Sequence, residues 1–152
     1  KPETVARLAK VPGIIGLKEA TGDLGRTPLL RELCGPDFAL YSGDDASGCD
    51  FMLQGGDGVI SVTTNIAAPQ MADMCRAALA GDAGQAHDIN NRLMPLHQTL
   101  FCEPSPIPVK WACARLGLMA TATLRLPLTD LTPEGEQAMA RALTTAELMA
   151  SV

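Results

Sequence analysis

The sequence has no excess of basic residues and no long apolar run. Lysine and arginine together number 12, against 17 aspartates and glutamates, which gives a net charge of −5. Such a balance offers no basic surface for nucleic acid or for an anionic membrane. The apolar runs are too short to span a bilayer, and no charged-then-apolar leader opens the chain. These absences predict a cytoplasmic protein whose partners are small molecules or other soluble proteins.

Paired metal ligands are also lacking. The five cysteines form an odd set without any C-x-x-C spacing, so neither a disulfide framework nor a zinc site is predicted. His87 and His97 are ten residues apart, which does not match the spacing of paired ligands on a helix. We therefore predict free, buried thiols and no metal.

The first half of the chain alternates helices with short strands. With 152 residues, 47% of them hydrophobic, the chain has the size of one domain and can bury a core. The patterns predict helices over 1–10, 26–34 and from Asp44 or Asp45 to Gln54, and strands over 14–17, 38–42 and 58–64. This alternation is typical of a parallel sheet with right-handed crossovers.

The second half is predicted to contain helices only. They cover 69–80, 83–101 with a bend at Pro95, 107–116, and 133–149 with Thr132 as the cap. Three prolines at alternating positions predict an extended, stiff linker over 103–108. We expect two regions, a barrel segment over 1–80 and a helical carboxyl-terminal region over 81–152.

Lys18 is the first candidate for chemistry. It follows the apolar run 14–17, precedes a turn at Thr21-Gly22, and shares a strand face with Ile14 and Gly16. Active sites of α/β folds lie at this carboxyl end of the strands. A lysine among apolar groups loses its proton more readily, and the free amine can attack a carbonyl to form a Schiff base. The local pattern alone favours a solvent-exposed residue, so the wider context decides.

Three parallel strands are too few for a complete fold. A doubly wound sheet usually has five or more strands, and an eight-stranded barrel needs five others. Three strands would leave two open edges and an uncovered face. The sequence therefore predicts the carboxyl-terminal part of a TIM (β/α)8 barrel or a related larger fold, and we expect earlier strands to be missing.

Three segments follow one another in a characteristic order and spacing, namely 16–22 (GLKEATG), 40–45 (LYSGDD) and 55–65 (GGDGVISVTTN). In this order they resemble the dihydrodipicolinate synthase and N-acetylneuraminate lyase superfamily of class I aldolase-like barrels. Three later segments resemble the dihydrodipicolinate synthase branch, namely 91–97 (NRLMPLH), 103–112 (EPSPIPVKWA) and 123–129 (TLRLPLT). Together they cover essentially the whole chain.

The resemblance implies a TIM barrel in which Lys18 forms a Schiff base with pyruvate, so that the protein's own lysine serves and no external cofactor is expected. The derived enamine would attack aspartate semialdehyde and give 4-hydroxytetrahydrodipicolinate, on the route to diaminopimelate and lysine. Gly43 would sit close to the substrate and Ile60 would contact the carbons of pyruvate, although both also fit as a turn glycine and a core isoleucine. By family analogy the protein would be a homotetramer.

The resemblance also implies what this half lacks. The family's threonine pair, proton-relay tyrosine and carboxylate-binding arginine belong to the amino-terminal half, so the chain is expected to be inactive without that half as a partner. Thr63-Thr64 and Tyr41 do not correspond to these residues, and Thr63-Thr64 is expected to end the last strand.

Two other functions remain open at this stage. The chain could belong to a different pyruvate-dependent aldolase of the N-acetylneuraminate lyase type, with another aldehyde as its substrate. It could also be a non-catalytic module that associates through its exposed strand edges. The pair Asp44-Asp45 could serve acid-base chemistry, but the helix that follows favours a capping role.

Overall fold

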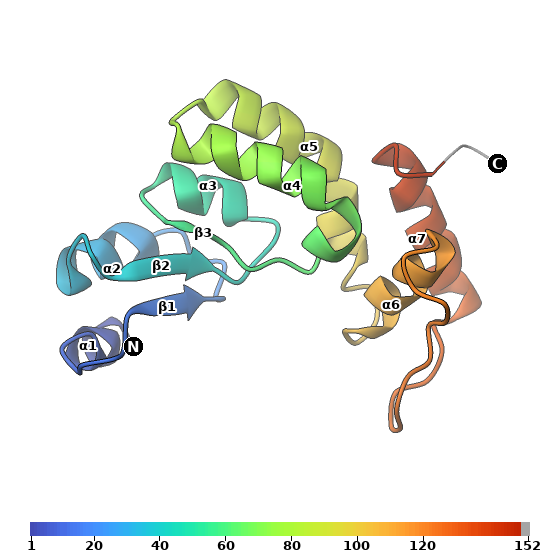
Figure 1. Ribbon diagram of the computed structural model, residues 1–152, viewed down its shortest axis with the longest axis horizontal. Coiled ribbons are helices and arrows are strands. Elements are labelled where there is room, and N and C mark those ends of the chain that lie inside the picture. Colours follow the sequence, from blue (N-terminus) through green and yellow to red (C-terminus); the bar gives the residue numbers. More distant parts are fainter. Residues whose placement is uncertain (150–152) are drawn as a thin grey trace. The chain divides into compact units, whose positions relative to one another are not determined.

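A computed structural model describes residues 1–149 of the chain, and within them it has seven helices and three strands (Figure 1). The order is α1 (Pro2–Leu8), β1 (Gly16–Glu19), α2 (Arg26–Cys34), β2 (Ala39–Ser42), α3 (Gly48–Leu53), β3 (Gly58–Val59), α4 (Thr64–Leu79), α5 (Ala83–Thr99), α6 (Ile107–Arg115) and α7 (Pro133–Thr145). No helix in this part of the chain is both long and apolar enough to cross a membrane.

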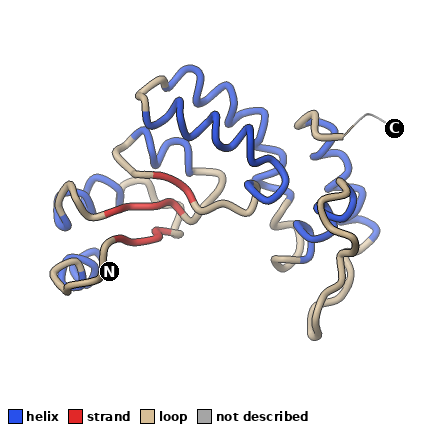
Figure 2. Tube along the Cα trace, viewed as in Figure 1, coloured by secondary structure: helices blue, strands red, loops and turns tan. Residues whose placement is uncertain are grey.

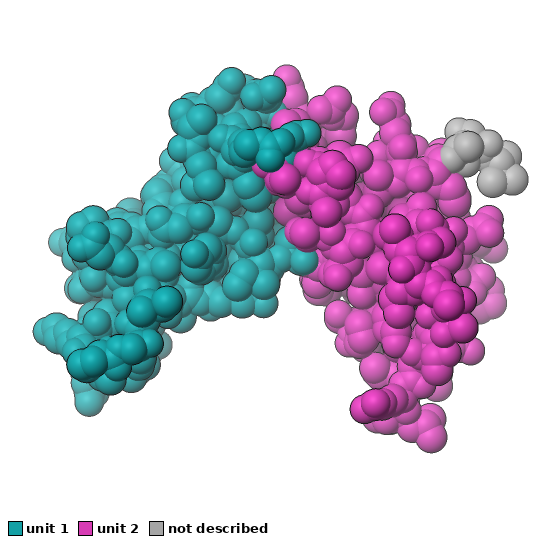
Figure 3. Space-filling view, in the orientation of Figure 1, with its two compact units in different colours: residues 1–61, 73–87 teal, residues 62–72, 88–152 magenta. Residues whose placement is uncertain are grey.

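The chain divides into two compact units (Figure 3). Unit 1 consists of residues 1–61 and 73–87, and unit 2 consists of residues 62–72 and 88–152. One of the three boundaries between them lies just before α4, and the other two fall inside α4 and α5. Unit 1 therefore contains the whole sheet, whereas α6 and α7 belong to unit 2. The expected division at residue 80 stays a prediction.

The sheet in unit 1 is parallel, in the order β1-β2-β3 (Figure 2). One of its faces is covered by helices. Leu40 of β2 is fully buried there with Leu30 of α2 and Phe51 of α3, and Phe38 completes the cluster. Burying such side chains contributes about 1.5–3 kcal/mol each. Helices and strands that follow one another along the first half of the chain thus pack together in one core.

Most of the predicted elements are confirmed, with small shifts. The glycines predicted to stop α2, α3, α4 and α6 all have positive φ, namely Gly35, Gly55, Gly81 and Gly117. Thr132 caps α7, since its side chain accepts a hydrogen bond from the Gly135 N–H at 3.1 Å. The strand predicted over 14–17 lies two residues later, because Gly16 is the first residue to pair with β2.

The strand predicted over 58–64 is wrong in length. β3 has only two residues, and the Ile60 N–H donates to the Ser42 carbonyl, 2.8 Å away, at the last residue of β2. Beyond that point β2 offers no further partner, so the chain leaves the sheet and Thr64 begins α4. The expectation that Thr63-Thr64 ends a strand is therefore wrong. Thr63 is buried instead, with its hydroxyl 2.8 Å from His97 Nδ1 in unit 2.

Three further differences lie around prolines and a helix end. α4 starts before Pro69 and is interrupted at Ala67, whose φ and ψ of −136° and 41° are not helical. The segment 103–108 is not extended, because it turns and Ile107 already begins α6. Pro108 fits the first turn of α6, where a missing N–H breaks no helical bond. α7 ends at Thr145 rather than Met149, since Glu147 has a φ of 58° and the Leu148 N–H turns back to the Leu143 carbonyl.

A single arginine joins the loops that lead into β2 and β3. Arg31 Nη2 donates to Asp57 Oδ2 at 2.6 Å, and the Leu40 N–H donates to the same oxygen at 2.7 Å. The guanidinium also donates to four backbone carbonyls, those of Gly35, Pro36, Phe38 and Gly55, at distances from 2.7 to 3.2 Å. Burial raises the pKa of Asp57, but the bonds from Leu40 and Arg31 and the charge of Arg31 outweigh it, so the pKa is lowered overall.

We predict that Arg31→Met destabilises unit 1 by about 2 kcal/mol, because several carbonyls and one carboxylate lose a charged donor. The control is Arg76→Met, which removes an exposed pair with Asp73 and should cost under about 0.5 kcal/mol. Urea unfolding followed by far-ultraviolet circular dichroism measures the stability of both variants. Tryptophan fluorescence is not suitable, because Trp111 lies in unit 2 and both substitutions lie in unit 1. Equal losses in the two variants would contradict the prediction.

Candidate active site

Lys18 lies near the carboxyl end of β1. It is the third of the four residues of the strand and pairs with Tyr41 of β2. The strand ends one residue later, and a turn over 20–25 leads into α2. The predicted position of the amine at the carboxyl end of a parallel strand is therefore confirmed, and this is the end at which α/β barrels place their chemistry.

Gly43 follows β2 directly and lies against the side chain of Lys18. Its N–H donates to the Glu19 carbonyl at 2.6 Å. A Cβ at position 43 would come within 2.6 Å of Lys18 Cε and 2.8 Å of Ala20 Cβ, closer than real Cβ contacts. The absence of a side chain at this position leaves room for the lysine chain beside the backbone.

Ile60 follows β3 directly and is on the same sheet face as Lys18. Tyr41 pairs with Lys18 on one side and with Gly58 on the other, and Ile60 comes two residues after Gly58. Because strand side chains alternate with a period of two, these positions share one face. The structure thus brings Lys18, Gly43 and Ile60 to the carboxyl ends of three neighbouring strands.

This face of the sheet is open within residues 1–149. Lys18 is exposed, Tyr41 is 39% exposed and Ile60 is 51% exposed, whereas Leu40 on the opposite face is fully buried. The apolar surroundings predicted for Lys18 are therefore not supplied by the described part of the chain. Parallel sheets are usually covered on both faces, and the described residues cover only one face of this sheet.

Glu19, next to Lys18, is a buried residue that the sequence analysis did not identify, and its carboxylate binds the turn after β1. Its Oε1 accepts from the Thr21 N–H at 2.8 Å, and its Oε2 accepts from Arg26 Nε at 2.7 Å. Burial raises the pKa of Glu19, but the hydrogen bonds from Thr21 and Arg26 and the charge of Arg26 lower it below the ordinary 4.5 overall. This pairing ties the turn after β1 to the first residue of α2 and so fixes the end of the strand that carries Lys18.

The expectation that an aspartate caps α3 is wrong, because the N-cap residue is Ser47 and no side chain makes a capping hydrogen bond there. Asp44 holds the turn before the helix instead. Its Oδ2 accepts from the Ser47 N–H at 3.0 Å and from the Ser47 hydroxyl at 2.6 Å. These bonds stabilise the turn after Gly43, which leads into α3. Among residues 1–149 there is no group of three or more histidine, cysteine, aspartate or glutamate side chains arranged to hold a metal ion.

The fold and the site together define a class. Three parallel strands with their crossover helices, and a lysine at the carboxyl end of the sheet, form part of a TIM (β/α)8 barrel. The model of the dihydrodipicolinate synthetase family matches residues 1–146. The chain therefore belongs to this family.

Curated relatives agree with that assignment. The 4-hydroxy-tetrahydrodipicolinate synthase of Sodalis glossinidius is 60% identical over 148 residues, which cover 97% of this chain and 51% of the relative. The enzyme of the same name from Escherichia coli O139:H28 has the same identity and coverage. The chain spans about half the length of the curated relatives it matches, and it corresponds to their carboxyl-terminal half.

Solved structures show the same fold. A chloride-inhibited dihydrodipicolinate synthase from Acinetobacter baumannii, in complex with pyruvate, matches with a TM-score of 0.94 and 44% identity, over 98% of this chain and 51% of that one. The enzyme from Cyanidioschyzon merolae with lysine bound matches with a TM-score of 0.91 and 39% identity, over 98% and 50%.

The lowered pKa of Glu19 predicts a pH-dependent difference between the wild type and Glu19→Gln. The carboxylate stabilises the fold fully above its unfolded pKa of about 4.5, and this contribution is lost as the pH falls through the lower folded pKa. The variant should therefore be less stable at pH 7, and the gap in the free energy of unfolding should close towards pH 3.

Urea unfolding at a series of pH values measures that gap. Glu32→Gln is the matched control, since Glu32 is exposed on α2, and it should follow the wild type at every pH. A gap for Glu19→Gln that is the same at pH 3 and pH 7 would exclude the carboxylate as its cause.

Proposed function

We propose that Lys18 is the Schiff-base nucleophile of a 4-hydroxy-tetrahydrodipicolinate synthase, a lyase that condenses pyruvate with aspartate 4-semialdehyde. One observation carries the proposal. At the carboxyl end of the sheet, the backbone of Gly43 leaves space for the side chain of Lys18, and any Cβ there would come within 2.6 Å of Lys18 Cε. Support comes from the relatives of that name and from the related enzyme that was solved in complex with pyruvate.

The chemistry begins with the free amine of Lys18. Its nitrogen attacks the ketone carbon of pyruvate, and loss of water gives an iminium ion. The positive nitrogen draws electrons from the neighbouring methyl group, so a proton leaves that carbon and an enamine forms. The enamine carbon then bonds to the aldehyde carbon of aspartate semialdehyde, whose oxygen takes up a proton. Attack of the substrate's own amine on the iminium carbon closes the ring and releases Lys18.

The residues beside Lys18 have simpler roles in this proposal. Gly43 lets the bound pyruvate approach the backbone, because no side chain stands in the way. Ile60 is apolar and 51% exposed on the same face, and it contacts the methyl carbon of pyruvate. Glu19 acts through the turn that it anchors and does not touch the substrate.

An amino-terminal half completes the site in this proposal. It covers the open sheet face and removes water from around Lys18. By the family resemblance it also brings the threonine pair, the tyrosine and the arginine. Without it, general acid-base catalysis of about 10²–10⁴-fold is lost. We further propose a cytoplasmic homotetramer, by analogy with the family.

Borohydride trapping tests the role of Lys18. We expect pyruvate and borohydride to fix a stable adduct on Lys18, located by peptide mass mapping, and to do so faster after a separately prepared amino-terminal half is added. Lys18→Arg should abolish the adduct, since a guanidinium does not form the imine. Lys10→Arg, a change at another exposed lysine of unit 1, should leave it intact.

The proposal fails if no adduct forms in the completed barrel, or if it forms on another lysine. In the completed barrel, a panel of aldehydes then tests the second substrate. Preference for aspartate semialdehyde over N-acetylmannosamine supports the synthase, and the reverse preference identifies an aldolase of the N-acetylneuraminate lyase type.

The close approach of Gly43 to Lys18 predicts the effect of Gly43→Ala. The new methyl group displaces the lysine chain and meets Ala20 Cβ, so trapping by pyruvate should slow by about tenfold or more. The control is Gly84→Ala in α5, where the new Cβ would have no neighbour closer than 3.7 Å. An unchanged trapping rate in Gly43→Ala would show that this space is not needed.

A further inference from the structure

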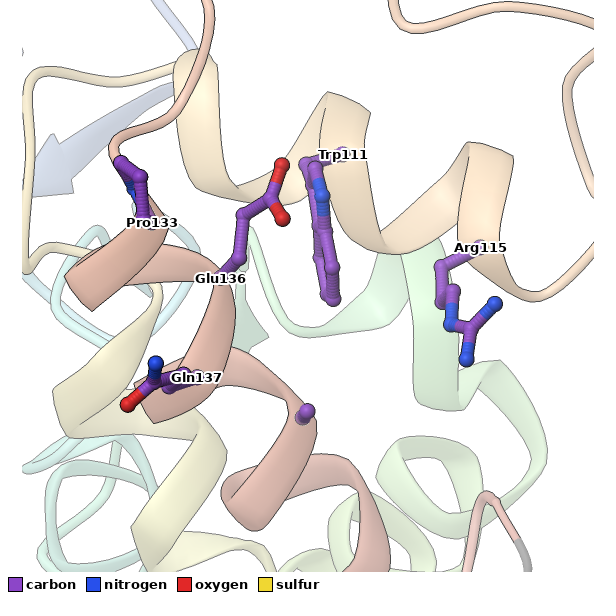
Figure 4. Close-up of a pocket in the computed structure, with 6 residues that line it drawn as sticks. Trp111, Arg115, Pro133, Glu136 and Gln137 are labelled. Carbon is purple, nitrogen blue, oxygen red and sulfur yellow. The ribbon is translucent and has the colours of Figure 1, made fainter. Parts of the chain in front are cut away.

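A depression between α6 and α7 in unit 2 carries charged residues, but they do not form one site (Figure 4). Arg115 lies on α6 and Glu136 on α7, and the ring of Trp111 stands between the two charged groups. A small ligand bound to one of these groups is therefore kept from the other. The open sheet face in unit 1 is different, because its large side chains and its glycines fit together closely.

Two large side chains on the open sheet face lie over glycines of the adjacent segment of chain. A Cβ at position 43 would come within 2.6 Å of Lys18 Cε, so the lysine chain lies over Gly43. A Cβ at position 58 would come within 3.1 Å of Tyr41 Cδ1 and 3.2 Å of its Cε1, so the tyrosine ring lies over Gly58. Gly43 is two residues beyond Tyr41, the partner of Lys18, so the lysine chain leans towards the carboxyl end of the sheet.

The ring of Tyr41 forms a floor between Lys18 and Ile60. Tyr41 pairs with Lys18 of β1 and with Gly58 of β3, and neighbouring strands lie about 4.8 Å apart. Ile60 comes two residues after Gly58, which places it one side-chain position nearer the carboxyl end on the same face. A small molecule held between the amine of Lys18 and the side chain of Ile60 would therefore lie on the tyrosine ring.

We propose that this floor makes Tyr41 the residue that selects among 2-oxo acids by the size of the group beyond the ketone. The inference rests on the proposed role of Lys18 as the nucleophile. When the ketone carbon bonds to the lysine nitrogen and water leaves, the methyl group of pyruvate fits between Ile60 and the ring. A longer alkyl group meets the ring, which is backed by Gly58. One extra methylene in an apolar pocket changes selectivity by about 10-fold to 200-fold.

Competition between two 2-oxo acids in one sample measures this selectivity. The 152-residue chain is combined with the separately prepared amino-terminal half and given equal concentrations of pyruvate and 2-oxobutanoate. Borohydride then reduces each imine to a stable amine, and the two adducts on the Lys18 peptide differ in mass by one methylene group. We expect the pyruvate adduct to exceed the other by about tenfold or more. Nα-acetyl-lysine in the same sample gives the ratio for an amine without a site.

Substitutions at position 41 assign the selectivity to the ring. Tyr41→Val removes the ring and keeps a residue that suits a strand, so the ratio should fall about tenfold, towards that for Nα-acetyl-lysine. Tyr41→Phe keeps the ring and should keep the wild-type ratio. The matched control is Phe101→Val, which truncates a 53% exposed ring in unit 2 and should also keep that ratio. Each ratio is measured on trapped protein alone, so it does not depend on the folded fraction.

Three outcomes overturn the inference. A wild-type ratio equal to that of Nα-acetyl-lysine shows that the site does not select by size. An unchanged ratio in Tyr41→Val shows that the ring is not the cause, and a fall in Tyr41→Phe assigns the selectivity to the hydroxyl instead. A failure of the proposed function is a distinct result, because then neither acid forms an adduct on Lys18 in the completed barrel, and the basis of both proposals is lost.

Discussion

The bond between Arg31 and Asp57 holds together the parallel sheet on which the site depends. Asp57 Oδ2 receives both the Arg31 guanidinium and the Leu40 N–H, while the guanidinium reaches the carbonyls before β2 and β3. These contacts lie at the amino ends of the strands, and Lys18 lies near the carboxyl end of β1. The stabilising contacts and the candidate site thus lie at opposite ends of the sheet, as is typical of TIM barrels.

The two faces of the sheet differ in how well the described residues cover them, and this difference sets the surroundings of Lys18. The face with Leu40 is packed against helices, and the face with Lys18 is open. The cover that the proposed Schiff-base chemistry needs is not supplied by the described residues, and the chain spans about half the length of the curated relatives it matches.

Local signals predicted most of the fold. Glycine stops, the Thr132 cap and the apolar runs act within a few residues of the chain, so α2, β2, α5, α6 and the start of α7 could be read from the sequence. The predicted bounds were wrong where pairing between strands sets the end of an element. β1 begins at Gly16 and β3 ends at Val59 because β2 offers partners only over that range. Glu19 was missed because its partner Arg26 is seven residues away, across a turn.

The candidate site likewise has features that the local sequence predicted and features that depend on tertiary contacts. The sequence alone predicted its chemistry, since Lys18, Gly43 and Ile60 stand in segments that resemble the family. Tertiary structure decided that the three share one face, that Gly43 lies against the Lys18 side chain, and that this face is open. The reason is physical: residue type and local propensity act along the chain, whereas register, close approach and exposure depend on which distant segments pack together.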